Sequence, residues 1–182
     1  MAGDPSAREE HTLAYRYIKD EVERVASKYG TRDPVALIRE CGAILKYSDR
    51  YVSLKGYYFH SARSDFIVIN AKLPRAEKRI VAAHELAHFI LHREQAKHGP
   101  IHDTMMFSVS SRMEYEANLF CAELLLDDGE VMDAARETEG DFFTMSKTLG
   151  VMPELLLFKL HGMNERGSRF VLPLSLNSGF LK

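Results

Sequence analysis

The chain has 182 residues, of which 46% are hydrophobic and 27% are charged, and its formal net charge is −2. This length and balance are typical of one soluble globular domain with a sizeable core. A charge so near zero, with no block of like charge, argues against a strong electrostatic footprint for nucleic acid. No apolar run approaches the roughly 20 residues that cross a bilayer, and the N-terminus does not resemble a signal peptide, so we expect a cytoplasmic protein. The two cysteines, Cys41 and Cys121, lack metal-site spacing and are expected to be buried free thiols.

The first part of the chain predicts two helices. Asp33 and Pro34 supply a capping side chain and a proline for the start of the second helix, Val35 to Cys41, which Gly42 closes. The first helix can end at Gly30, and its apolar residues recur at every third or fourth position: Ala14, Ile18, Val22, Val25 and Tyr29.

Three strands are predicted next, because the sequence becomes rich in β-branched and aromatic residues. They cover Ala43 to Tyr47, Tyr51 to His60, and Asp65 to Asn70, with short polar breaks between them. We expect a small antiparallel sheet of about three strands. Strands that precede further helices indicate an α+β fold class.

The stretch 79–92 places two imidazoles and a carboxylate in an otherwise mostly apolar helix. Positions four apart lie one above the other on a helix, so His84 and His88 can direct two ring nitrogens at one ion. Glu85 then projects beside that ion. In the His-Glu-x-x-His arrangement the histidines bind Zn²⁺ and the glutamate handles the proton of a metal-bound water. The alternative is a pair of core histidines satisfied by backbone carbonyls, but one metal ion would partner all three buried groups together.

A catalytic zinc site generally takes a third protein ligand. The predicted helix 112–126, which ends at Asp127-Asp128-Gly129, carries Glu114 on an apolar face beside the small Ala117. Packed on the first helix by this face, it would bring Glu114 to the ion. Glu116 remains the alternative third ligand, although its side of the helix, shared with Glu123, reads as a solvated stripe.

His92 is a further histidine one turn beyond His88. Ligands at i, i+4 and i+8 of a straight helix would spread along roughly 12 Å of its axis, too far for one ion. We therefore expect His92 to cap the helix or to support the other ligands. The metzincin class of zinc peptidases is excluded, because Leu91 and Glu94 stand where it requires a glycine and a histidine.

Together these motifs resemble those of the ImmA/IrrE family of metallopeptidases, and the resemblance covers most of the chain from about Asp33 to Gly162. It implies a zincin-like, gluzincin-type endopeptidase with one Zn²⁺ ion, which cleaves a helix-turn-helix repressor encoded nearby in a mobile element or stress regulon. The resembling residues are Asn70 at a strand end, Arg79 to His88 continuing to His92, and Glu114-x-Glu116-Ala117-Asn118-x-Phe120-x-Ala122-Glu123-Leu124-Leu125.

On this resemblance His84, His88 and Glu114 are the zinc ligands and Glu85 is the catalytic residue. Two departures mark a divergent member: Cys121 stands where the family commonly has alanine, and Leu126-Asp127-Asp128 replaces its usual Met-Pro.

We expect residues 1–182 to form one domain. A flexible tail over 1–10 precedes a zincin-like catalytic core over 11–140, and 163–182 form a C-terminal tail without an assigned role. Two short helices over 141–162, joined at a glycine, superficially resemble a DNA-binding helix-turn-helix. The second of them offers a single lysine among apolar residues, so we expect this pair to pack on the core and not to bind nucleic acid.

The sequence leaves the presence of a lid, the strand that pairs with the substrate and the oxyanion residue undecided. The stretch Lys97 to Asp103 reads as an exposed loop that could act as a lid, and Tyr51 to Phe59 could pair with an extended substrate. The residue that stabilises the oxyanion could be Tyr57, Tyr58, His60 or His102.

An alternative function is a non-catalytic, metal-stabilised module that binds a repressor or toxin partner. The presence of Glu85 favours catalysis, since a purely structural site would want a fourth protein ligand. A silent state, in which His98 or His102 occupies the open metal position, is a third hypothesis.

Overall fold

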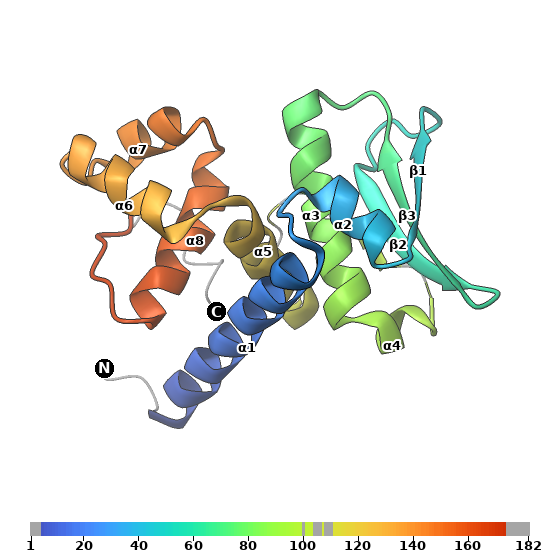
Figure 1. Ribbon diagram of the computed structural model, residues 1–182, viewed down its shortest axis with the longest axis horizontal. Helices are drawn as coiled ribbons and strands as arrows, with labels where there is room; N and C mark the ends of the chain where they lie inside the picture. Colours follow the sequence, from blue (N-terminus) through green and yellow to red (C-terminus); the bar gives the residue numbers. More distant parts are fainter. Residues whose placement is uncertain (1–4, 100, 104–106, 108–110, 174–182) are drawn as a thin grey trace.

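The computed structural model describes residues 5–99, 101–103, 107 and 111–173 and confirms the α+β class. A small sheet lies at one end, α6 to α8 lie at the other, and α5 lies between them (Figure 1). Among the helices of these described ranges, none is long and apolar enough to cross a membrane. In chain order the elements are α1 (Pro5–Tyr29), α2 (Pro34–Glu40), β1 (Ile44–Ser48), β2 (Gly56–Ser61), β3 (Ser64–Asn70), α3 (Arg75–Leu91), α4 (Arg93–Ala96), β4 (Ile101–Asp103), α5 (Arg112–Leu125), α6 (Asp128–Glu137), α7 (Phe142–Leu149) and α8 (Pro153–Glu165).

The two N-terminal helices form where the sequence predicts them. Helix α1 begins at Pro5, inside the range expected as a tail, and residues 1–4 lie outside the described part. Helix α2 has Pro34 in its first turn, and the Asp33 side chain accepts a hydrogen bond from the Ala36 N–H. Both cysteines are free, as expected, but only Cys121 is fully buried, because Cys41 lies at the partly exposed end of α2.

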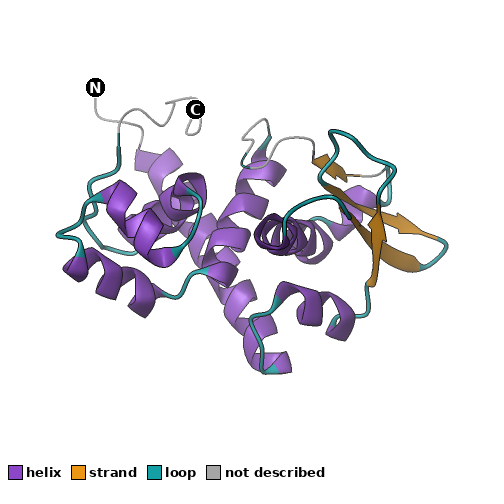
Figure 2. Cartoon of the chain, turned by 90° about the horizontal axis from the view of Figure 1, so that it is seen from above, coloured by secondary structure: helices purple, strands orange, loops and turns teal. Residues whose placement is uncertain are grey.

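The sheet is mixed and has the order β1-β3-β2-β4, so the expected antiparallel arrangement is wrong in one respect. β2 and β3 form an antiparallel hairpin, but β1 pairs with β3 in parallel, with Ile44 opposite Phe66. β3 takes one of the two inner positions, in keeping with its apolar sequence, since Ile67, Val68 and Ile69 are all buried. Figure 2 shows the sheet from above, with helices gathered on one side of it.

The segment expected as an exposed loop contains a fourth strand. Ile101 to Asp103 form β4, which pairs antiparallel with β2. Three residues without an alternating pattern are too few to predict a strand from sequence. Of the rest of the expected lid, residue 100 lies outside the described residues.

Helix α3 packs on β2 and β3 at very close range. A Cβ atom added to Gly56, the first residue of β2, would lie 2.5 Å from Val81 Cγ1 and 3.0 Å from Glu85 Oε1. The absence of a side chain at Gly56 therefore lets the helix approach the strand. Residues 56, 58 and 60 face α3, since side chains alternate along a strand.

Helix α8 packs on α5, and α7 packs on α8. Helix α6 was not predicted, because Asp127-Asp128-Gly129 was interpreted only as the end of the preceding helix. Asp127 instead caps α6 and accepts hydrogen bonds from the N–H groups of Gly129 and Glu130. Gly150 ends α7 in the left-handed conformation with φ 63°, as the predicted glycine turn requires. Of the C-terminal tail, residues 174–182 lie outside the described part.

A buried ion-pair cluster fixes α8 to α5. Lys159 Nζ lies 2.7 Å from Glu123 Oε2, and both side chains are almost fully buried. Arg166 binds the other oxygen of Glu123 at 2.6 Å and also contacts Asp128. Burial raises the pKa of the Asp128 carboxyl, but hydrogen bonds from Lys159 and Lys19 outweigh that effect and lower it overall. Glu123 is thus a buried, paired residue, and its interpretation as part of a solvated stripe is wrong.

Replacing Lys159 by Met should lower the free energy of unfolding by about 3 kcal/mol, because it leaves buried carboxylates short of a partner charge. Urea denaturation followed by circular dichroism measures the loss. The matched control is Lys97→Met, which removes an exposed ion pair with Glu94 and should change stability little. Equal losses in the two variants would contradict a stabilising role for the buried cluster.

Replacing Gly56 by Ala should lower the free energy of unfolding by about 1–3 kcal/mol, because the new methyl group overlaps Val81. The double variant Gly56→Ala/Val81→Ala removes Val81 Cγ1, the atom nearest to the new methyl group. We expect its cost to be about 1 kcal/mol less than the sum of the two single substitutions. If the losses in free energy of unfolding add exactly in a double-mutant cycle, the overlap with Val81 is not the cause of the loss at Gly56.

Candidate metal centre

Helix α3 holds His84, Glu85 and His88 inside the molecule. His84 is 4% exposed, and Glu85 and His88 are 0% exposed. The two histidines lie one turn apart, with ring centroids separated by 4.8 Å. The predicted burial of this helix is therefore confirmed, and its polar side chains need partners inside the protein.

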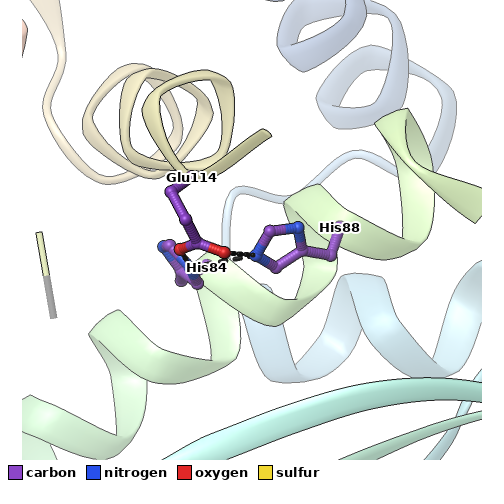
Figure 3. Close-up of side chains that lie close together, drawn as sticks. All are labelled: His84, His88 and Glu114. Atoms are coloured by element: carbon purple, nitrogen blue, oxygen red, sulfur yellow. Dashed lines mark hydrogen bonds and ion pairs between the residues drawn. The ribbon is translucent and has the colours of Figure 1, made fainter. Parts of the chain in front are cut away.

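Helix α5 brings a carboxylate to these histidines. Ser111 caps this helix by accepting a hydrogen bond from the Glu114 N–H at 3.2 Å, which places Glu114 in the first turn. At this position a glutamate often reaches back to the backbone of the capping residue. Here the Glu114 side chain is directed at α3 instead, as Figure 3 shows.

The ligand-type atoms of the three side chains converge. His84 Nε2 lies 3.1 Å from His88 Nε2 and 3.2 Å from Glu114 Oε2, and His88 Nε2 lies 3.4 Å from Glu114 Oε1 (Figure 3). All these atoms lie within 4.8 Å of one another. Among the residues that the structure describes, this is the one group of three or more histidine, cysteine or acidic side chains arranged to hold a metal ion.

Burial and mutual contacts favour deprotonated donor atoms at neutral pH. Burial lowers the pKa of His88 to about 4, so its imidazole is neutral and keeps a lone pair. Burial by itself raises the pKa of Glu114, but hydrogen bonds with His84 and His88 outweigh it and bring the value to about 2. A metal ion requires both forms, a neutral imidazole and an ionised carboxylate.

The donor set fits a divalent transition metal. Two imidazole nitrogens and one carboxylate oxygen are ligands that zinc accepts, and this number leaves a position for water or substrate. Glu85 follows His84 directly on the helix and lies against β2, since the position of a Cβ at Gly56 is only 3.0 Å from its Oε1. Gly56 was not singled out from the sequence, although an isolated glycine in a strand pattern is a signal of close backbone approach.

His92 and Glu116 lie beside this group without joining it. Helix α3 ends at Leu91, and His92 Nδ1 lies 3.0 Å from His88 Nδ1, the ring nitrogen that faces away from Glu114. His92 Nε2 lies 3.0 Å from Glu116 Oε2. Glu116 is therefore partly buried against a histidine, and the expectation that it belongs to a solvated stripe is wrong.

The oxyanion candidates differ in where they point. Tyr58 and His60 both bond to Asp65, at 2.7 Å and 2.9 Å. Tyr57 lies on the face of β2 opposite to α3, where its hydroxyl contacts that of Tyr51 at 2.9 Å. The side chain of His102 lies outside the described residues.

The sequence suggests His98 as a group that could occupy the open metal position, and the strand at Tyr51 to Phe59 as a partner for an extended substrate. His98 is exposed and does not belong to the metal-type group. The strand expected to pair with a substrate has no open edge at Gly56 to Tyr58, because β3 occupies one side and β4 the other.

Comparison with known proteins places these residues inside a peptidase family. The family described as the IrrE N-terminal-like domain matches residues 45–161, a range that includes α3 and α5. A relative from Bacillus phage phi105, described as an uncharacterized immunity region protein 2, is 34% identical over 145 residues, which make up 80% of this chain and 90% of that protein. The chain therefore belongs to the ImmA/IrrE family, and its metal-type group lies within the part of the chain that defines the family.

Proposed function

We propose that this protein is a zinc-dependent endopeptidase that hydrolyses a peptide bond in a protein substrate. The observation that carries the proposal is the convergence of His84, His88 and Glu114 beside Glu85, in a chain that belongs to a peptidase family. His84, His88 and Glu114 would hold one Zn²⁺ ion. Their donor chemistry and the pKa values of His88 and Glu114 support this assignment.

When bound, the ion supplies Lewis acidity that polarises the scissile carbonyl and lowers the pKa of water. Glu85 accepts the proton of the attacking water and passes it to the leaving amine. Its carboxylate lies against the start of β2, where Oε1 is 3.0 Å from the position of a Cβ at Gly56, and this packing would hold the carboxylate in place. This fixed placement removes most of the orientational freedom that proton transfer would otherwise cost.

The substrate would lie along the outer edge of β4, which has no partner strand among the described residues. That strand is at the end of the sheet order, and its Asp103 is paired with Gly56, the residue that touches Glu85. An extended peptide that added to this edge would run beside β4, one strand away from Gly56 and Glu85.

A helix-turn-helix transcriptional repressor of a mobile element or stress regulon is the substrate that we propose. The resemblance to ImmA/IrrE peptidases supports this choice, and so does the description of the phage relative as an immunity region protein. The alternative is a module that binds such a repressor without cutting it.

Replacing Glu85 by Gln should leave zinc affinity close to that of the wild type and lower peptide cleavage by at least about 100-fold, because the amide keeps the shape but accepts no proton. Replacing Glu114 by Gln should instead lower zinc affinity, because it removes the charged donor. Zinc affinity is measured by competition with a chromophoric chelator, and cleavage is measured with a natural substrate. Cleavage by the Glu85→Gln variant at the wild-type rate would refute the role of Glu85.

Incubation with the regulator encoded beside this gene should yield two fragments of that regulator, and a zinc chelator should prevent their formation. Mass spectrometry of the fragments identifies the bond that is cut. The Glu85→Gln protein serves as the control with an intact metal group. A stoichiometric complex that forms without fragments would support the binding module and contradict the peptidase.

A further inference from the structure

We infer that His92 and Glu116 are positioning residues that hold the His88 imidazole with its Nε2 lone pair facing Glu114 and His84. This inference rests on the proposed zinc site. It gives two residues outside the ligand set the role of orienting one ligand, His88. Neither residue touches the reacting atoms in this assignment. They act only through His88.

A continuous series of hydrogen bonds leads from the ligand group to the protein surface. His88 Nδ1 contacts His92 Nδ1 at 3.0 Å, and His92 Nε2 contacts Glu116 Oε2 at 3.0 Å. Arg112 Nε then donates to Glu116 Oε1 at 2.7 Å. Each ring nitrogen of His92 and the outward nitrogen of His88 thus has a defined partner.

The carboxylate at one end sets the direction of every bond in the series. Glu116 accepts a hydrogen bond from Arg112 Nε on Oε1 and contacts His92 Nε2 with Oε2, and a carboxylate paired with a guanidinium only accepts. His92 Nε2 must then carry the proton of this bond, and in that tautomer its Nδ1 is bare. This bare nitrogen accepts a hydrogen bond from His88 Nδ1–H. Only this tautomer of His88 leaves Nε2 unprotonated, the form that a metal ligand requires.

The local fold makes this arrangement specific. Helix α3 ends at Leu91, and His92 has φ −123° and ψ 24°, so its ring leaves the helical path and turns toward His88 and α5. Glu116 lies two residues after Glu114 on α5, so the same helix that brings the proposed ligand also brings the support. His92 is 2% exposed and His88 is 0% exposed, and water therefore has little access to replace the bond between them.

The test measures zinc affinity in the absence of any substrate, by competition with a chromophoric chelator. His92→Phe removes the acceptor for His88 Nδ1–H and should weaken zinc binding by about 10–100-fold. His92→Asn offers an oxygen near the former Nδ1 position and should restore most of that loss. Glu116→Gln keeps the size of the side chain and leaves His92 in place, but it removes the negative charge. We therefore expect a smaller loss of zinc affinity, of about 3–10-fold.

Two controls separate positioning from mere packing. Glu94→Gln makes the same substitution at an exposed carboxylate nearby and should leave zinc affinity unchanged. The unfolding midpoint of each metal-free variant shows whether the protein is folded. The absorption bands of the Co²⁺-loaded protein should shift in His92→Phe and return toward the wild-type bands in His92→Asn.

Equal zinc affinity of the wild type and a folded His92→Phe or Glu116→Gln protein would overturn the inference while leaving the proposed peptidase intact. Equal losses in His92→Phe and His92→Asn would also overturn it, because the accepted hydrogen bond would not be the cause. A wild-type protein that binds no zinc would instead refute the proposed function itself. The two failures are therefore distinguishable.

Discussion

The contact between α3 and α5 is the interaction on which the rest of this structure depends. Along this interface α5 presents Ala117 and Cys121, both fully buried, and the Cys121 thiol lies 3.6 Å from the backbone oxygen of Ile80. Small residues allow the two helices to approach closely enough for Glu114 to reach His84 and His88. Without that approach, two imidazoles in the interior would lack a carboxylate partner, and their burial would be costly. The packing and the chemistry of the site thus rest on the same contact.

Each helix of this pair is in turn held from its outer side. Helix α3 lies on the sheet at the one position of β2, Gly56, that has no side chain. Helix α5 is fixed near its other end by Glu123, which binds Lys159 and Arg166 of the C-terminal helices. We interpret this buried cluster as a device that sets the position of α5 along its axis, because charged partners inside a protein tolerate little displacement.

The parts of the site that follow from local spacing could be predicted from sequence, and those that follow from distant partners could not. The shared face of His84 and His88 is a property of any helix, and the small residues near Glu114 indicated which side of α5 packs inward. The parallel pairing of β1 with β3 depends on which side of the β2–β3 hairpin β1 joins. Likewise, Glu123 looks solvated within its own helix, because its partners lie 36 and 43 residues further along the chain.

Glu114 and Glu116 illustrate why a sequence pattern alone leaves the third ligand undecided. Both stand in the first turns of α5, both contact histidines of the segment that includes α3, and both have a lowered pKa. The two glutamates differ in the number of imidazole nitrogens that face them. Glu116 faces one imidazole nitrogen, Nε2 of His92, and a single proton satisfies this pair. Glu114 faces two Nε2 atoms only 3.1 Å apart, and one shared cation can serve two lone pairs and a carboxylate where separate protons would crowd one another. The number of nitrogen atoms that converge on each glutamate, which only the folded chain determines, is what favours Glu114 as the proposed third ligand.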